Sequence, residues 1–122
     1  MTEVINLKLK QVYRITTFVP PEMLEKLVAG ILRVLPLKYA RYDQVLWWSS
    51  PGVEHTRVKE AGQDVAERSA SVKLEFSIPR DESLLQKALN EGIIPNHPWG
   101  EPIIYIAEGL ATRNKSDEDA PA

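Results

Sequence analysis

His97 is the residue of this 122-residue chain whose type and surroundings best suit chemistry. It begins the run His-Pro-Trp-Gly-Glu-Pro (residues 97–102), which also supplies Trp99 and Glu101. An imidazole titrates near neutral pH, so it can serve as an acid, a base or a metal ligand. His97 and Glu101 can also simply hydrogen-bond backbone groups while the two prolines stiffen the chain before a strand. We favour this structural role for His97.

His55 is the second of two histidines, and it follows Glu54 in a polar stretch. Adjacent side chains diverge on a strand, so a metal site at His55 would need His97 or carboxylates from elsewhere. These two histidines are the metal candidates. The chain has no cysteine, which excludes disulfides and thiolate catalysis, and it has no glycine-rich phosphate-binding motif. The sequence therefore identifies neither a cofactor nor a catalytic residue.

Four strands and two helices are predicted to position these residues. Strands are predicted where apolar and polar residues alternate or where apolar, β-branched and aromatic residues are frequent. These stretches are residues 12–19, 39–48, 65–78 and 103–107. Apolar residues at helical spacing predict one helix from the proline pair at 20–21 to Pro36, and another over residues 81–91. Asp81 is its expected N-cap, and Gly92 is expected just past its end. Residues 49–64 are expected to form a long hairpin loop.

This β-α-β-β-α-β order predicts an α+β fold, the ferredoxin-like sandwich, with two helices on one face of a four-stranded antiparallel sheet. The other sheet face would be bare. We expect Phe18, one of Trp47 and Trp48, and one face of the last strand to be buried there between subunits, with the second tryptophan in the core. The chain is therefore predicted to form a homo-oligomer.

Composition limits the classes of partner and location. The 15 basic and 17 acidic residues leave a net charge of −2, which argues against nucleic-acid binding. No apolar run is long enough to span a membrane, and the start of the chain has no apolar leader. With no cysteine, the protein is expected in the cytoplasm. We expect one domain over residues 1–111 and a disordered polar tail over residues 112–122, which lack large apolar side chains.

The run 97–102, followed by the apolar residues 103–106, resembles the end of the small inserted domain of the Nif-three-like dimetal proteins. The run Val-Pro-Pro-Glu at 19–22 and the pair Tyr42 and Asp43 also fit that family's layout. Trp99 stands where the family has tyrosine, and Gly100 is a further departure. The resemblance implies a fold similar to the CutA and PII signal-protein trimers. The family's dimetal-binding residues belong to regions with no counterpart here, so no metal site follows.

This resemblance favours a non-enzymatic PII/CutA-like module, most readily a trimer, that binds a small ligand or a protein partner. Its candidate ligand-binding residues are His97, Trp99, Glu101, Tyr42 and Asp43. The alternative is a small enzyme or metal-binding protein with a site at the subunit interface near His97.

Overall fold

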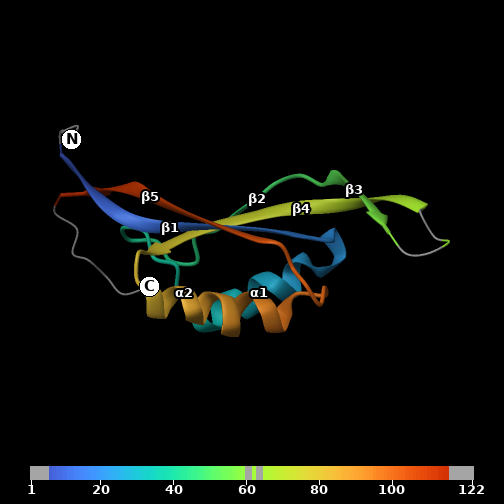
Figure 1. Ribbon diagram of the computed structural model, residues 1–122. Helices are drawn as coiled ribbons and strands as arrows, with labels where there is room; N and C mark the ends of the chain where they lie inside the picture. The colour runs from blue at the N-terminus through green and yellow to red at the C-terminus, as the bar shows by residue number, and fades with distance from the viewer. Residues whose placement is uncertain (1–5, 60–61, 63–64, 116–122) are drawn as a thin grey trace.

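The chain folds into two layers, an antiparallel sheet and a set of helices on one of its faces (Figure 1). The computed structural model describes residues 6–59, 62 and 65–115. Its strands are β1 (Leu7–Val19), β2 (Trp47–Trp48), β3 (Gly52–Val58), β4 (Val65–Pro79) and β5 (Ile104–Asn114). Its α-helices are α1 (Leu24–Val34) and α2 (Glu82–Lys87). The other helical segments are the 3₁₀-helices η1 (Pro21–Met23) and η3 (Ile94–Asn96) and the π-helix η2 (Ala88–Ile93).

The order of the strands is β2-β4-β1-β5, with β3 beside the first half of β4. Every pairing is antiparallel. This arrangement confirms the predicted α+β, ferredoxin-like class. It has five strands where four were expected, because residues 52–58 of the predicted loop form the additional strand β3, which pairs with a different part of β4 than β2 does.

The core lies between the sheet and the helices. On β1, Ile15, Thr17 and Val19 are fully buried, and the register sets them opposite buried residues of β4. The helix layer meets this sheet face with Leu27 and Ile31 of α1, which are also fully buried. The strand alternation read from the sequence is therefore confirmed for β1 and for the second half of β4. Each buried aliphatic side chain of this kind contributes about 1.5–3 kcal/mol.

Gly30 lets the end of the helix layer approach α1 closely. A Cβ atom at Gly30 would lie 2.1 Å from the Asn96 side chain, so only glycine leaves room for it. The Asn96 amide then donates to the carbonyl of Gly92 at 2.8 Å. Pro36 ends α1 as predicted, since Leu35 before it is extended, the conformation that a following proline favours.

The second helix begins as predicted and ends later. Asp81 caps α2, because its carboxylate accepts from the backbone N–H groups of Ser83 and Leu84. The expectation that Gly92 terminates the helix is wrong. The chain continues through the π-helix η2 and the 3₁₀-helix η3 to Asn96. Gly92 is buried against α1, where a Cβ would lie 3.4 Å from the Val34 side chain, so its role is close packing.

The strand predicted over residues 39–48 is wrong for most of its length. Only Trp47 and Trp48 are in a strand. Positive φ angles at Leu37, Ala40 and Gln44 reverse the chain repeatedly, which extended backbone does not allow. The result is a compact loop over residues 36–46, anchored by Leu37 with only 3% of its surface exposed.

This loop holds itself together through backbone hydrogen bonds. Tyr39 and Tyr42 exchange two of them, at 2.9 and 2.8 Å. The N–H of Gln44 donates to the carbonyl of Pro36 at 2.7 Å, which ties the end of the loop to its beginning. The loop is therefore a defined element that can position side chains.

The long loop predicted over residues 49–64 is also wrong in part. Residues 52–58 form β3, which pairs with residues 65–71 of β4. This hairpin, called the arm below, projects past the helices on the right of Figure 1. Val53, Val58 and Val65 on the arm are 75%, 54% and 65% exposed. Nothing in the described part of the chain covers it.

The last strand is longer than predicted. Its final residues Thr112, Arg113 and Asn114 pair with Leu9, Lys8 and Leu7 of β1, so the tail boundary drawn at residue 112 is too early. These positions have polar side chains, and the backbone ladder rather than an apolar face keeps them in the strand. Residues 116–122 of the predicted tail lie outside the described part of the chain. In that described part, no helix has the length and hydrophobicity to cross a membrane.

Candidate functional site

His97 lies in the segment that connects η3 to β5, and only 8% of the residue's surface is exposed. Its Nε2 atom lies 2.7 Å from the carbonyl oxygen of Phe18, at the end of β1. Its Nδ1 atom accepts the backbone N–H of Trp99 at 3.2 Å. A carbonyl can only accept, so Nε2 carries the proton and Nδ1 does not. The imidazole is therefore neutral, in the Nε2–H tautomer.

This arrangement makes His97 a structural clamp between β1 and the run 97–102. Burial lowers the pKa of His97 below its ordinary value, and the hydrogen bond to the Phe18 carbonyl opposes that effect only in part. Protonation would also take away the Nδ1 lone pair that accepts from Trp99. Both ring nitrogens are engaged by backbone, so neither is free to bind a metal or to exchange protons with a substrate.

Trp99 and Glu101 differ in how they lie relative to His97 and to solvent. The Trp99 ring packs on the imidazole, with ring centroids 4.9 Å apart and the planes tilted by 52°. Trp99 is half-buried, whereas Glu101 is exposed. The run leads into the sheet through a hydrogen bond from the Thr17 hydroxyl to the carbonyl of Ile103, at 2.9 Å. Of the three predicted residues, His97 and Trp99 pack against each other, and Glu101 is exposed.

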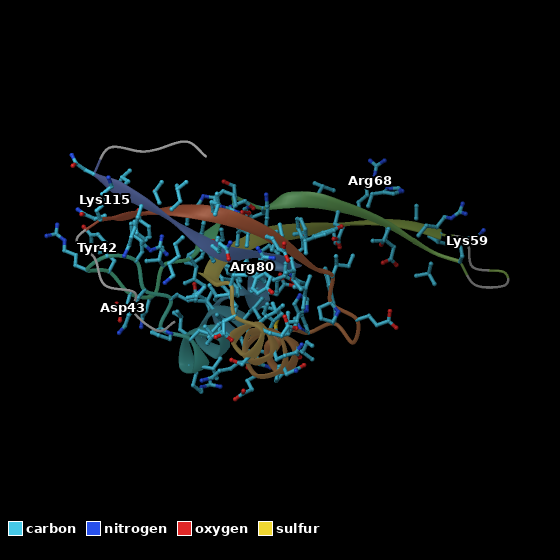
Figure 2. All side chains as sticks on the ribbon, turned by 60° about the vertical axis from the view of Figure 1, so that its left-hand side comes forward. Tyr42, Asp43, Lys59, Arg68, Arg80 and Lys115 are labelled. Carbon is cyan, nitrogen blue, oxygen red and sulfur yellow. The ribbon has the colours of Figure 1, made fainter. Side chains whose placement is uncertain are left out.

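Tyr42 and Asp43 lie at the other end of the sheet. Both are exposed on the 36–46 loop. That loop contacts Arg113, which pairs with Lys8 near the start of β1, whereas His97 contacts the end of the same strand at Phe18. Figure 2 shows Tyr42 and Asp43 together at one end of the molecule. The structure therefore does not bring these two residues to the run 97–102.

His55 is also separate from His97. It lies exposed on β3 of the arm, where Arg68 of β4 donates to its Nδ1 atom at 3.4 Å. Figure 2 places Arg68 and Lys59 on the arm, at the opposite end from Tyr42. Within residues 6–59, 62 and 65–115, no three His, Asp or Glu side chains are arranged to hold a metal ion. The two histidines proposed as metal candidates thus have no common site.

A cavity of about 750 Å³ lies elsewhere, on the bare face of the sheet beside the 36–46 loop. Such a volume is within the range of small-molecule sites, about 300–1,000 Å³. The loop contributes Tyr39 and the apolar side chains Leu37 and Val45, and β2 contributes Trp47. The strands supply most of its charged side chains. We call this space the bare-face cavity.

Among the residues that the structure describes, four cationic side chains and one carboxylate line the bare-face cavity. Arg14 of β1 and Lys73 of β4 both form ion pairs with the carboxylate, Glu75. The other two cations, Lys38 and Arg113, stand on the loop and on β5. The lining therefore carries an excess of positive charge, although the whole chain has a net charge of −2.

The aromatic rings of the bare-face cavity are held by the same cations. The guanidinium of Arg113 lies 4.3 Å from the Tyr39 ring centroid, and the Lys73 ammonium lies 5.7 Å from that of Trp47. Cation–π contacts of this kind orient the ring as well as the charge. Local sequence patterns do not reveal this cavity, because its residues come from four strands and a loop of irregular backbone. The signal that the sequence offered for this cavity was a set of charged side chains, Arg14, Lys73 and Glu75, on the bare face of the sheet.

Beside the cavity, the bare face carries two aromatic side chains. Phe18 and Tyr105 make an edge-to-face pair, with ring centroids 6.4 Å apart. Tyr105 is 60% exposed, and no described element covers it. The register of β1 and β5 sets Ile104 and Ile106 opposite Thr17 and Ile15, so these two isoleucines face the helices and Tyr105 faces away. A substitution that tests the role of the bare face should therefore be made at Tyr105.

The two tryptophans of β2 are both exposed, at 54% for Trp47 and 45% for Trp48. The expectation that one of them is in the core is wrong, because β2 is an edge strand. Trp47 pairs with Glu75 and lies on the bare face, whereas Trp48 pairs with Leu74 and lies on the helix side. Trp47 thus remains available to the cavity.

No family model matches the chain, and no curated protein matches it either. Solved structures do. A Bacillus cereus protein related to NIF3 matches with a TM-score of 0.70 and 20% identity, over 88% of this chain and 28% of that one. CutA1, the divalent ion tolerance protein of Ehrlichia chaffeensis, matches with a TM-score of 0.57 and 16% identity. GlnK of B. subtilis, in a complex with ATP, matches with a TM-score of 0.52 and 14% identity.

The chain covers very different shares of these proteins. It spans 86% of the CutA1 chain and 81% of the GlnK chain, but only 28% of the NIF3-related protein. The first two are therefore similar as whole chains, and the third contains a similar part. At these identities the likeness concerns the fold. The chain has the fold of the PII- and CutA-like small domains and resembles the one within the NIF3-related protein.

Proposed function

We propose that the protein is a homo-oligomeric, non-enzymatic module of the PII/CutA type, which binds a small ligand or a protein partner. The observation that carries the proposal is the sheet face that no helix covers. Phe18, Tyr105 and Trp47 lie on it with no described element above them. Aromatic residues gathered on an open face are typical of protein interfaces.

The arm supports the same proposal. It is a two-stranded ribbon of seven residue pairs with three exposed valines. A two-stranded hairpin without a covering layer is marginally stable in water. Neighbouring copies of the chain would supply the missing contacts. The likeness to CutA1 and GlnK over most of their lengths favours a whole module of this kind, and the resemblance to the CutA and PII trimers favours three copies.

A small-molecule ligand is supported by the bare-face cavity and by the complex of GlnK with ATP. The enzyme or metal-site alternative near His97 has no comparable support, since backbone groups engage both nitrogens of that ring. The absence of cysteine from the sequence agrees with a cytoplasmic location.

The assembly is tested by multi-angle light scattering of the full chain at tens of micromolar. We expect a mass of three chains. Tyr105→Lys should dissociate the assembly without unfolding the chain, because Tyr105 is exposed in the single subunit and a lysine buried between subunits would lack a partner.

Gln86→Lys is the matched control, since Gln86 is exposed on α2 in the helix layer. It adds the same charge and should leave the mass unchanged. A monomeric wild-type chain, or a Tyr105→Lys variant with the wild-type mass, would contradict the proposal.

A further inference from the structure

We infer that the bare-face cavity binds a small organic anion that combines a planar ring with a phosphate or carboxylate group. The inference rests on the proposed small-ligand function and adds to it a site and a ligand class. The cavity belongs to one chain, so its occupation can be measured whether or not copies assemble.

The charge of the lining favours an anion. Glu75 is the only carboxylate among the described lining residues, and it already has Arg14 and Lys73 as partners. Lys38 and Arg113 add two further positive charges to the same space. A ligand carrying negative charge would reduce this excess, and charge-assisted hydrogen bonds to Arg and Lys are among the strongest polar contacts.

The rings and the volume favour a planar body on that anion. Tyr39 and Trp47 border the cavity, and each has a cation near its ring. A flat ligand can stack on the remaining aromatic surface while its charged end meets the cations. A volume of about 750 Å³ suits a nucleotide-sized molecule, whereas inorganic phosphate alone would leave most of it unfilled.

The bare-face cavity begins beside the aromatic pair of the same face, where its lining residue Lys73 pairs with Phe18, and extends away from that pair toward Arg113. Arg113 stands at the end of β5, whereas Tyr105 stands at its beginning. The 36–46 loop that walls the cavity is fixed by its own hydrogen bonds and by the buried Leu37. The site is therefore preformed in the single chain.

Isothermal titration calorimetry of the full chain tests the inference with four probes: adenosine 5′-monophosphate, indole-3-acetate, adenosine and inorganic phosphate. We expect the first or the second to bind, and to bind at least tenfold more tightly than adenosine and phosphate. The phosphate and carboxylate sources are distinguished by which of the first two binds more tightly. Raising the salt concentration from 50 to 300 mM should weaken binding.

Two variants test the residues. Arg113→Gln and Lys73→Gln should each weaken binding about tenfold, since each removes one charge from the cavity. Arg80→Gln is the matched control. It removes the same charge from an arginine that pairs with Glu108 at 2.8 Å, on the helix side of β5, and that does not line the cavity.

Three results would overturn the inference: no binding of either anion at millimolar concentration, binding of adenosine as tight as that of its monophosphate, or equal weakening by Arg80→Gln and Arg113→Gln. Light scattering of the same samples reports assembly separately. A trimer that binds no probe would contradict this inference alone, and a monomer that binds would contradict only the proposed assembly.

Discussion

At the scale of single residues, His97 shows how a titratable side chain can serve the fold. Its two nitrogens join the end of β1 to the run before β5 through the Phe18 carbonyl and the Trp99 N–H. Only the neutral ring can make both contacts. The chemistry that suggested a catalytic or metal-binding role is thus used to hold two segments together.

The neutral state of His97 predicts a pH-dependent stability. Its pKa is lowered in the folded protein from the ordinary 6.5, so below that pH the unfolded chain takes up a proton that the folded chain does not. The contribution of His97 is therefore fully present above pH 6.5 and is lost as the pH falls from there toward the folded pKa. Urea unfolding at pH 7.5 and 5.5 should show a lower midpoint at pH 5.5.

The substitution His97→Gln should reduce this pH dependence, since glutamine does not titrate. His55→Gln is the matched control, because His55 is exposed on the arm and its loss should leave the pH dependence intact. A His97→Gln variant with the same pH dependence as the wild type would contradict the assignment.

The sequence predicted the structural role of His97 but not the bare-face cavity. Two prolines and a histidine at short spacing restrict a local segment, and local restraint can be inferred from neighbours in the chain. Arg113 contacts Tyr39 only because β5 and the loop meet in three dimensions, whereas the sequence alone predicts Arg113 in a polar tail. Contacts between distant segments depend on strand register and loop conformation, and neither can be read from local patterns in a single sequence.

At the scale of elements, the second helical segment is shaped by its contact with α1. Gly92 of η2 lies close to Ile31 and Val34 of α1, and Asn96 of η3 fills the space beside Gly30. This contact accompanies the change from α2 to the π-helix η2 and then to η3. The sequence predicts Gly92 just past the end of a helix, whereas the structure places it in this contact.

Gly30→Ala should therefore destabilise the protein, although alanine favours helix by about 1 kcal/mol over glycine. The new methyl group would overlap the Asn96 side chain and break its hydrogen bond to the Gly92 carbonyl. We expect a net loss of about 1–3 kcal/mol in urea unfolding.

Asn96→Ala provides the control for this prediction, because it removes the side chain that the methyl group would meet. The double variant should be no less stable than Asn96→Ala alone. A double variant whose losses simply add would show that the two residues do not compete for the same space.

The second strand and the loop after it could not be predicted for a physical reason. Aromatic and branched residues over 39–48 have strand propensity, yet Leu37 and Gln44 adopt positive φ angles that such residues rarely take. Burial of Leu37 and the hydrogen bonds of the loop outweigh local preference. Conversely, β3 is polar and exposed, so it lacks the apolar alternation that identifies a strand.

At the scale of the whole molecule, the sheet is longer than the helix layer at both ends (Figure 1). The arm extends past one end, and the pairing of β1 with the end of β5 extends past the other. The backbone ladder, rather than the core, holds these extensions. Their stability should therefore depend on strand pairs and on neighbouring copies.

Two truncations test the extension made by β1 and β5. Removing residues 112–122 deletes Thr112, Arg113 and Asn114 and their pairing with β1, whereas removing residues 116–122 keeps all three. We expect the longer deletion to lower the melting temperature by about 5 °C relative to the shorter one. Equal melting temperatures would show that this end of the ladder contributes nothing.

Shortening the arm tests its part in assembly. Val53 and Ala70 are paired, so residues 54–69 can be replaced by Asn-Gly, a two-residue hairpin turn. The core lies outside the arm, and we expect a folded chain with an unchanged helical circular dichroism signal but the mass of a monomer. A shortened chain that still assembles would assign assembly to the sheet face alone.

The outer backbone edges of β5 and β3 affect how copies of the chain can associate. Each of these strands has a neighbour on one side only within the described residues. If the outer edge of β3 joins the outer edge of β5 in the next copy, the contact is head-to-tail, and repeated addition either closes a ring or grows a filament. The angle between successive copies decides which, and it follows from sheet twist. A change that flattens β4 would therefore favour fibres over a closed particle.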